Sequence, residues 1–272
     1  MSKIIPFSEK TYIMGVLNVT PDSFYSGSRV NGIDLAVERG LKFIEEGAQI
    51  IDIGGESTRP GSASVSAEEE LQRVIPVLKR LRKLTNIPIS IDTYKPEVAE
   101  AALNEGADII NDITGLRYSD RIAELVSKFD TYLILMHMRG MPANMQDRAH
   151  YTNVVEEIST ELDISIKRAI NRGVNKNRII IDPGIGFAKR SFHNLLILKN
   201  LKKFKEKGYP LLVGLSRKFF IGVYTGLPTE ERLIPTVAAN AISIFNGADI
   251  IRVHDVKEAY FTVKISDAIA RF

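Results

Sequence analysis

The segment Gly47-Ala48-Gln49-Ile50-Ile51 recurs along the chain as Gly-Ala-Asp-Ile-Ile at residues 106–110 and again at 247–251. Each copy opens with a glycine, which suits the left-handed residue that ends a helix. The apolar residues that follow are typical of a buried strand. A joint of helix, glycine and strand that returns three times indicates a repeated βα unit.

Apolar residues recur at helical spacing between these joints. One such stripe consists of Ile33, Val37, Leu41 and Ile44, and a second of Leu71, Val74, Ile75, Leu78 and Leu81. We expect the second helix to begin after Ser66, because Ser66 and Glu69 have the spacing of a capping box.

Eight short apolar runs without strict alternation are typical of parallel strands that are covered on both faces. They are residues 13–17, 50–53, 89–91, 109–110, 132–136, 179–181, 211–213 and 250–253. Helical segments separate them with no linker, which predicts an α/β fold, a single (β/α)8 TIM barrel with outer helices, over one domain of residues 1–272. An open doubly wound sheet is the alternative if two of these runs are not strands.

The composition limits the classes of function. The net charge of +3 over 272 residues is too small to indicate nucleic acid as a partner. There are no cysteines, which excludes a disulfide framework and a thiolate zinc site. No apolar run is long enough to cross a membrane, and the first residues lack a signal-peptide core, so we expect a cytoplasmic protein. The basic run at 199–207 is interpreted as the solvated face of a helix.

A set of polar residues follows the predicted strands. They are Asn18, Asp52, Asp92, Asn111, His137, Asp182, Ser216, Lys218, Arg252 and His254. In a βα barrel the carboxyl ends of the strands meet at one mouth, where active sites of this fold lie. Strands also end in polar residues simply because loops are wet, but that explanation does not favour acids and amides so consistently.

This set has a chemical meaning. Carboxylates and amides can accept several parallel N–H bonds from the edge of a flat heterocycle. Arg59, Lys218, Arg252 and His254 supply positive charge and donors that suit phosphate. Together they favour a nitrogen heterocycle that carries phosphate as the ligand.

Metal sites are the main rival interpretation. The four histidines lack the spacing of a zinc site. A hard cation such as Mg²⁺ that bridges a diphosphate fits Asn18 and Asp22 better. The chain also has neither a phosphate loop of the GxxxxGKS type nor a nucleophile elbow.

Two loops at the predicted mouth are candidates for function. Residues 18–24 (NVTPDSF) follow the first strand, and residues 54–61 (GGESTRPG) follow the second. Either could be an ordinary turn marked by glycine and proline. Their place beside the polar set favours a functional role.

At these residues the chain closely resembles the dihydropteroate synthase family, nearly from end to end. The matching motifs are NVTPDSF at 18–24, DIGGESTRPG at 52–61, SIDTYKPEVA at 90–99, Asn111-Asp112, MHMRGMPANMQ at 136–146, DPGIGF at 182–187, SRK at 216–218 and RVHDV at 252–256. The resemblance implies a transferase of folate biosynthesis that condenses 6-hydroxymethyl-7,8-dihydropterin diphosphate with para-aminobenzoate. It also implies Mg²⁺ as cofactor and a homodimer.

The resemblance assigns roles to residues of this chain. The pterin-binding set would be Asp92, Asn111, Asp182, Lys218 and Arg252, of which Asp92, Lys218 and Arg252 would be catalytic. The diphosphate would be held by Asn18, Thr58, Arg59, Arg252 and His254, with magnesium at Asn18 and Asp22. The aminobenzoate would bind against Phe24, Pro60, Phe187 and Ser216.

The chain departs from the family pattern at a few positions. Phe219 stands where many relatives carry a small hydroxyl residue, Tyr25-Ser26 replaces serine–aspartate, and Arg139 replaces glutamine. These departures bear on aminobenzoate binding and on sulfonamide sensitivity, and they leave the pterin pocket unchanged.

Two other functions compete with this interpretation. A pterin-dependent methyltransferase barrel would share the acids and amides, but it would not need the STRPG, SRK and RVHD segments as diphosphate holders. A catalytically inactive pterin-binding barrel would be favoured by loss of Asn18, Arg59 or Lys218, and the chain contains all three.

Overall fold

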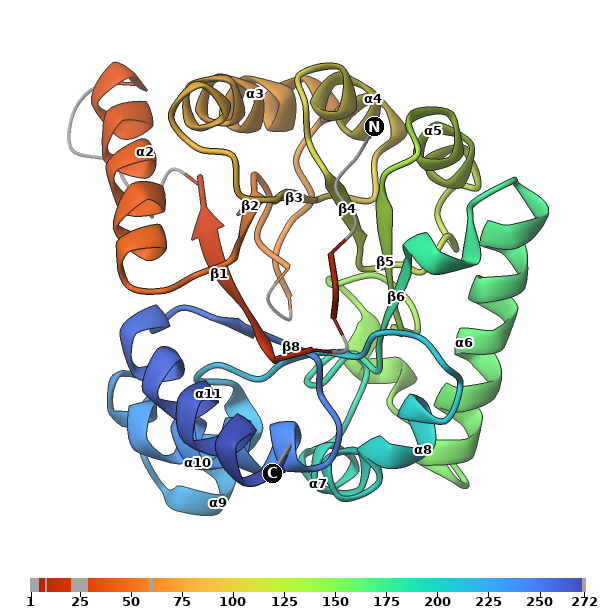
Figure 1. The fold of residues 1–272 in the computed structure, drawn as a ribbon. Coiled ribbons are helices and arrows are strands. Elements are labelled where there is room, and N and C mark those ends of the chain that lie inside the picture. The colour runs from red at the N-terminus through yellow and green to blue at the C-terminus, as the bar shows by residue number, and fades with distance from the viewer. Residues whose placement is uncertain (1–4, 8, 21–28, 59–60, 271–272) are drawn as a thin grey trace.

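The computed structural model describes residues 5–7, 9–20, 29–58 and 61–270 (Figure 1). Eight strands lie in that part of the chain and pair in parallel. They are β1 (Tyr12–Asn18), β2 (Ile50–Gly54), β3 (Ile89–Asp92), β4 (Ile109–Asp112), β5 (Tyr132–Met136), β6 (Ile179–Asp182), β7 (Leu212–Gly214) and β8 (Ile250–Val253).

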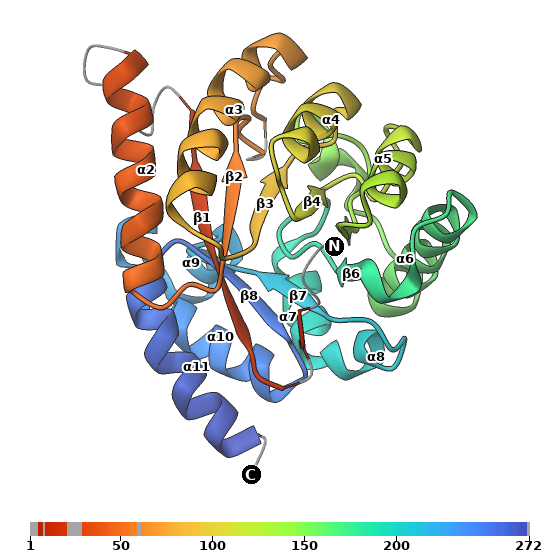
Figure 2. The same cartoon turned by 45° about the horizontal axis from the view of Figure 1, so that its top comes forward.

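Helices surround the strands, as Figures 1 and 2 show from two directions. They are α2 (Arg29–Glu45), α3 (Ala67–Leu84), α4 (Pro96–Asn104), α5 (Arg121–Phe129), α6 (Val154–Asn171), α7 (Ser191–Lys199), α8 (Leu201–Lys205), α9 (Phe219–Thr225), α10 (Leu233–Phe245) and α11 (Val256–Ala270). Short 3₁₀ turns are η1 (Met145–Arg148), η2 (Lys176–Arg178) and η3 (Thr229–Glu231). Within the described ranges, none of the helices has both the length and the apolar character of a bilayer span.

The strand order is β6-β5-β4-β3-β2-β1-β8-β7, so β1 pairs with both β2 and β8. The predicted barrel is confirmed, and the alternative of an open doubly wound sheet is wrong, because the order follows the sequence around a ring without reversing. The ring is weakest between β6 and β7. There the strands meet through an isolated bridge between Ile181 and Leu211.

The strands bury one set of side chains outward and another inward. The outward set, such as Ile51 and Ile91, packs with the helices in one large cluster. The inward set, including Met14 and Ile250, forms a separate cluster with no helical residue in it. The N-terminal segment lies at the end of the barrel where the strands begin, and it contributes Ile5 to the inner cluster (Figure 1).

The helix–glycine–strand joints are confirmed. Gly47, Gly106 and Gly247 have φ of 106°, 86° and 104°, a region that side chains with a Cβ rarely enter. At Gly47 a Cβ would also lie 2.5 Å from the ring of Tyr260. The capping box is confirmed in part, since Ser66 Oγ accepts a hydrogen bond from the Glu69 amide at 3.1 Å.

In the basic run at 199–207, Lys199, Lys202 and Lys203 are exposed, whereas Lys205 and Lys207 are partly buried and form ion pairs with Asp249 and Asp163. Leu201 and Phe204 are fully buried, which confirms the interpretation as a solvated helical face. The run is not one helix, however, because α7 ends at Lys199 and α8 begins at Leu201, with Asn200 between them.

Candidate active site

One row of the sheet brings four predicted strand ends side by side. Asn18 is in register with Gly54, Gly54 with Asp92, and Asp92 with Asn111. Gly54 leaves room between its neighbours, since a Cβ there would lie 3.6 Å from both Asn18 Oδ1 and the Asp92 Cβ. The register therefore lines the inner wall of the mouth with an amide, a gap, a carboxylate and a second amide.

Arg252 lies across the acids of this wall. Its Nε is 2.6 Å from Asp52 Oδ2 and its terminal nitrogen is 2.8 Å from Asp92 Oδ2. Asn111 Nδ2 donates to Asp52 Oδ2 at 3.2 Å. Asp52 is fully buried. It was predicted to lie among the polar strand-end residues, but the sequence motifs assigned it no role. The structure makes it the residue that orients both Arg252 and Asn111.

Burial dominates the electrostatics of Asp92. It raises the pKa of this carboxyl to about 7, although the charge of Arg252 acts in the opposite direction. The nearby charge of Asp52 adds to the rise. Asp92 therefore changes its charge near neutral pH, which is common for groups in functional sites.

Two acceptor atoms of this wall are buried without a hydrogen-bond partner among the described residues. They are Asp52 Oδ1 and Asp92 Oδ1. A buried acceptor without a donor costs about 1–3 kcal/mol, and such groups in native proteins need an explanation. A flat ligand with N–H donors on one edge would satisfy this wall.

A second wall is formed by Asp182 and Lys218. Asp182 Oδ1 accepts the Gly184 amide at 2.7 Å, and Lys218 Nζ donates to the Ile185 carbonyl. Burial lowers the pKa of Lys218 to about 8, with Arg252 acting in the same direction and Asp182 and Asp92 opposing. Lys218 Nζ also lies 4.6 Å from the ring centre of Phe187. These mutual electrostatic effects indicate that the two walls lie close to each other.

Ser216 and His254 meet at the ends of β7 and β8. Ser216 Oγ is 3.1 Å from His254 Nδ1. Between Ser216 and Lys218, Arg217 has a positive φ of 54° and forms a two-point ion pair with Asp255, at 2.8 and 3.0 Å. This pair fixes the SRK and RVHD segments to each other, a role that the sequence motif did not reveal.

The loop after β2 is held at its base by buried charges. Lys95 donates to both Glu56 and Glu70, and Tyr94 Oη donates to Glu56 at 2.9 Å. Further along, the Gly61 amide donates to the Pro142 carbonyl at 3.1 Å. Thr58 is half-buried between these two fixed points. Lys95 escaped the sequence analysis because lysine after a strand is usually solvated.

We expect Lys95→Met to destabilise the protein by about 3–5 kcal/mol, because it leaves two buried carboxylates without their cation. Burial raises the pKa of Glu70. Lys95 opposes that rise, so the variant should have a still higher Glu70 pKa. A carboxyl whose pKa is raised in the folded state lowers the free energy of unfolding as pH rises, so the destabilisation by Lys95→Met should be larger at pH 8 than at pH 5. Urea unfolding at both pH values measures it. Lys79→Met, which removes an exposed ion pair with Glu105, is the control and should change stability little. An equal effect of both variants would contradict this role of Lys95.

Not every predicted residue falls in the described part of the chain. Asp22, Phe24, Arg59 and Pro60 lie outside the described residues, as do Tyr25 and Ser26. His137 was predicted among the strand-end residues, but it belongs to neither of the two walls described above. It is buried against Glu161 and Lys189, and burial together with the charge of Lys189 lowers its pKa to about 3.

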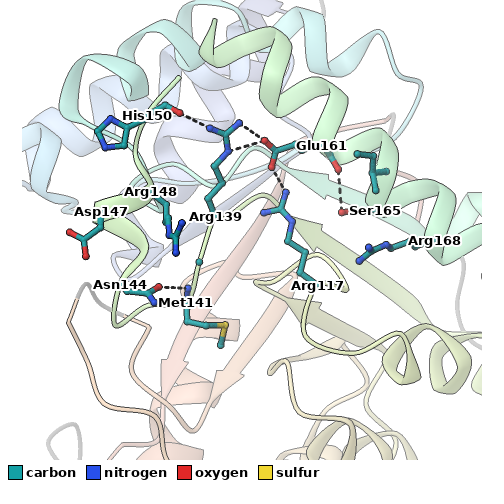
Figure 3. Close-up of a pocket in the computed structure, with 12 residues that line it drawn as sticks. Arg117, Arg139, Met141, Asn144, Asp147, Arg148, His150, Glu161, Ser165 and Arg168 are labelled. Atoms are coloured by element: carbon teal, nitrogen blue, oxygen red, sulfur yellow. Dashed lines mark hydrogen bonds and ion pairs between the residues drawn. The ribbon is translucent and has the colours of Figure 1, made fainter. Parts of the chain in front are cut away.

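A cleft of about 950 Å³ lies beside the loop between β5 and α6 (Figure 3). Arg117 and Arg139 both bind Glu161 at its edge. Burial alone would raise the pKa of Glu161, but hydrogen bonds from His137 and Arg139 hold it well below its usual range. The cleft contains none of the predicted site residues.

The sequence matches the family of pterin binding enzymes over residues 14–254. It is 46% identical over 271 residues to the dihydropteroate synthase of Clostridium beijerinckii, covering 99% of this chain and 98% of that protein. The chain belongs to the dihydropteroate synthase family of pterin-binding enzymes.

Solved dihydropteroate synthases share the fold closely. The enzyme of Clostridium difficile, determined in the presence of pteroic acid, superposes with a TM-score of 0.93 at 43% identity, covering 98% of this chain and 100% of that one. The Xanthomonas albilineans dihydropteroate synthase with 4-aminobenzoic acid gives a TM-score of 0.91 at 42% identity, covering 97% and 94%. The family resemblance stated from the motifs is therefore confirmed.

Proposed function

We propose that this protein is a dihydropteroate synthase, which joins 6-hydroxymethyl-7,8-dihydropterin diphosphate to para-aminobenzoate and releases pyrophosphate. Membership of the family supports the activity. The observation that carries it is the cluster at the carboxyl ends of the strands in which Asp52, Asp92 and Asp182 lie beside Arg252 and Lys218. Acids that accept N–H bonds stand there beside cations that attract an anionic leaving group.

In this proposal the pterin edge binds to the acids and the amide. Asp92, Asn111 and Asp182 accept its N–H groups, and the unpaired Asp92 Oδ1 supports that role. Lys218 donates to the ring carbonyl and ring nitrogen. Arg252 lies over the ring face, a position supported by its contacts with Asp92.

Charge separation is the difficult part of the reaction. The carbon–oxygen bond to the diphosphate breaks and leaves a cation on the exocyclic methylene, which the electron-rich ring shares. Buried carboxylates beside the ring stabilise that cation far better than water would. The aromatic nitrogen then forms the carbon–nitrogen bond and gives up a proton. No covalent link to the enzyme is required.

The aminobenzoate would bind on the side of Phe187 and Ser216. Phe187 is partly exposed and packs against Lys218, and Ser216 follows β7 next to α9. Phe24 and Pro60 complete this slot in our proposal. Phe219, one of the departures from the family pattern, is 74% exposed at the start of α9. Carboxylate contact would then depend on Ser216 and the start of this helix.

The diphosphate would be held by two groups of residues at the mouth. They are Asn18, Thr58 and Arg59 after the first two strands and Arg252 and His254 at the eighth strand. Magnesium fits this mouth chemically, because Asn18 presents an amide oxygen and Mg²⁺ usually combines one or two such ligands with substrate phosphates. No group of three His, Cys, Asp or Glu that could hold a metal occurs among the residues with a described position. Bound there with Asp22 and Asn18, the ion would neutralise the leaving group.

A direct assay tests the function. Purified protein with pterin diphosphate, para-aminobenzoate and magnesium should release pyrophosphate and form 7,8-dihydropteroate only when both organic substrates are present. Binding of pterin without any product would favour the inactive barrel. Methyl transfer from a methylated pterin to a corrinoid would favour the methyltransferase. The cytoplasmic location and the single domain stay predictions.

We also propose a homodimer through one apolar face of the barrel. Most of the described large hydrophobic residues that are exposed lie on α7, α9, α10 and α11, which are neighbours in Figure 1. They are Phe192, Leu195, Leu196, Phe219, Val223, Tyr224, Ile234, Ile242, Phe245, Phe261, Ile265 and Ile269. An apolar surface of this extent is typical of a protein interface.

Phe261→Lys is expected to shift the protein from dimer to monomer, because it places a charge in this apolar face at a residue that is 60% exposed. Light scattering with size-exclusion chromatography measures the mass. Ile170→Lys, an equal change at an exposed residue of α6, should leave the dimer intact. A monomeric wild-type protein, or two variants of equal mass, would contradict the proposed interface.

A further inference from the structure

The loop after β6, residues 184–188, is held by side chains at four consecutive backbone carbonyls. Each of these oxygens accepts a hydrogen bond from a different side chain. The pairs are Lys218 with Ile185, Gln146 with Gly186, Lys189 with Phe187 and Tyr151 with Ala188. Ala188 has a positive φ of 50°, so the backbone is held in a conformation that it would not adopt by itself.

Lys189 is the most deeply buried of the four donors, with 4% of its surface exposed. Its Nζ is 2.8 Å from the Phe187 carbonyl, 3.1 Å from His137 Nδ1 and 3.4 Å from the His137 carbonyl. Three acceptors match the three N–H donors of an ammonium group. Lys189 is therefore saturated by contacts within the protein and faces away from solvent.

A chain of contacts supports Lys189 from behind. His137 Nε2 lies 3.2 Å from Glu161 Oε2, so the ring can donate to the carboxylate while Nδ1 accepts from Lys189. Glu161 is fixed in turn by Arg139 and Arg117. The Phe187 backbone is thus connected to helix α6 through an unbroken set of hydrogen bonds.

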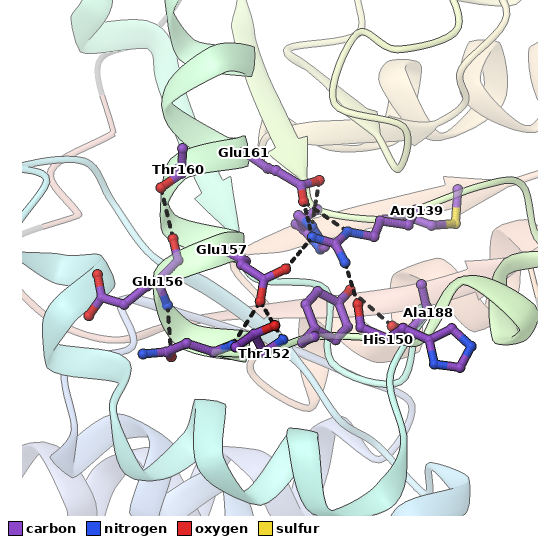
Figure 4. Close-up of polar contacts among 12 residues, drawn as sticks. Arg139, His150, Thr152, Glu156, Glu157, Thr160, Glu161 and Ala188 are labelled. Carbon is purple, nitrogen blue, oxygen red and sulfur yellow. Dashed lines mark hydrogen bonds and ion pairs between the residues drawn. The ribbon is translucent and has the colours of Figure 1, made fainter.

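Arg139 connects this set of hydrogen bonds to Tyr151, the donor to the Ala188 carbonyl. Figure 4 shows the contacts of Arg139. Its guanidinium binds Glu161 and Glu157 and donates to the His150 carbonyl at 2.5 Å. It also lies 4.1 Å from the ring centre of Tyr151, whose hydroxyl donates to the Ala188 carbonyl at 3.0 Å. Arg139 therefore supports the donors to two successive carbonyls, those of Phe187 and Ala188.

We infer that Lys189 and Tyr151 are positioning residues for the aromatic amine, which act by fixing the backbone on which the Phe187 side chain is mounted. Neither touches a substrate. The inference rests on the proposed function, in which Phe187 forms one side of the aminobenzoate slot. Asp92 and Asn111 of the pterin walls lie on β3 and β4, whereas Asp182 ends β6 and accepts the Gly184 amide at the start of this same loop. Lys189 and Tyr151 bind the carbonyls of Phe187 and Ala188, further along the loop, so the two residues should govern amine binding more than pterin binding.

The test compares Lys189→Met with Lys199→Met, the same change at an exposed lysine of α7. We expect Lys189→Met to raise the KM for para-aminobenzoate about tenfold, the effect of losing one buried hydrogen bond. The KM for pterin diphosphate and the kcat at saturating amine should both stay within about twofold of the wild-type values, because the lost bond affects amine binding alone. Lys199→Met should match the wild type in all three.

Tyr151→Phe provides a second and milder variant, since it removes only a hydroxyl group. It should raise the KM for the amine about threefold, in the range of one neutral hydrogen bond. Should Lys189→Met fail to fold, Tyr151→Phe alone decides. An unchanged amine KM in the folded variants, or an equal rise in both KM values, would overturn the inference. Absence of product with the wild-type protein would instead refute the proposed function.

Discussion

Replacement of Asp92 by asparagine is expected to lower turnover about a hundredfold or more, the cost of removing a buried charge that faces a developing opposite charge. The carboxylate lies on the inner wall with one oxygen bound to Arg252 and the other without a partner among the described residues. Asparagine keeps the size and one acceptor, so the fold should survive. Thermal unfolding checks that, and near-normal turnover would remove Asp92 from the mechanism.

The same residue should set the acidic limb of the pH profile. Burial raises the pKa of Asp92 to about 7, and the charged form is the one that accepts N–H bonds from the ring. Hence kcat/KM for pterin diphosphate should rise as pH increases through that value, because this ratio reports ionisations of the free enzyme. Asp92→Asn should abolish this limb, and a limb that persists in the variant belongs to another group.

Replacement of Lys218 by alanine is expected to have a similar effect, about a hundredfold on turnover. It removes the cation beside Asp182 and the donor that holds the Ile185 carbonyl. Initial rates with both substrates saturating measure the loss. Lys167→Ala, at an exposed lysine of α6, should keep the wild-type rate and serves as the control.

Lys218 should also limit activity in alkaline solution. Burial lowers its pKa to about 8, and the charged form is the one that donates, so the rate should fall as pH rises above that value. Lys218→Arg keeps the charge at all accessible pH values and should move this limb upward. If Lys218→Ala retained wild-type turnover, Lys218 would have no part in the chemistry.

The sequence predicted the fold well, because the fold depends on local patterns, and the roles assigned to the site residues stay predictions. Three glycine joints and eight apolar runs fixed the number and order of the strands. The polar residue after each run then had to lie at the mouth, since parallel strands in a barrel end at the same edge. Asp92 and Asn111 accordingly lie in register.

The residues that the sequence reading missed are those whose partners lie far away in the chain. Lys95 binds Glu56 across 39 residues, and Arg217 binds Asp255 across 38. Lys189 and His137 are separated by 52 residues. Lysines in loops are usually exposed to solvent, so the sequence predicts exposure. Only the fold shows that a hydrogen-bond acceptor from a distant part of the chain lies beside the lysine. His137 was grouped with the mouth for the opposite reason, as its position after a strand outweighed its burial.

The seam between β6 and β7 differs from the other strand pairs of the barrel, because one isolated bridge joins the two strands there. Asp182 is the last residue of β6, and Ser216 and Lys218 follow β7, so the wall formed by Asp182 and Lys218 spans the seam. Elsewhere the ladder fixes the spacing of adjacent strands, whereas here a single bridge and the contact of Lys218 with the Ile185 carbonyl do so. A side chain, Lys218, therefore does at this seam what backbone hydrogen bonds do between the other strands, because it joins the loop after β6 to the segment after β7.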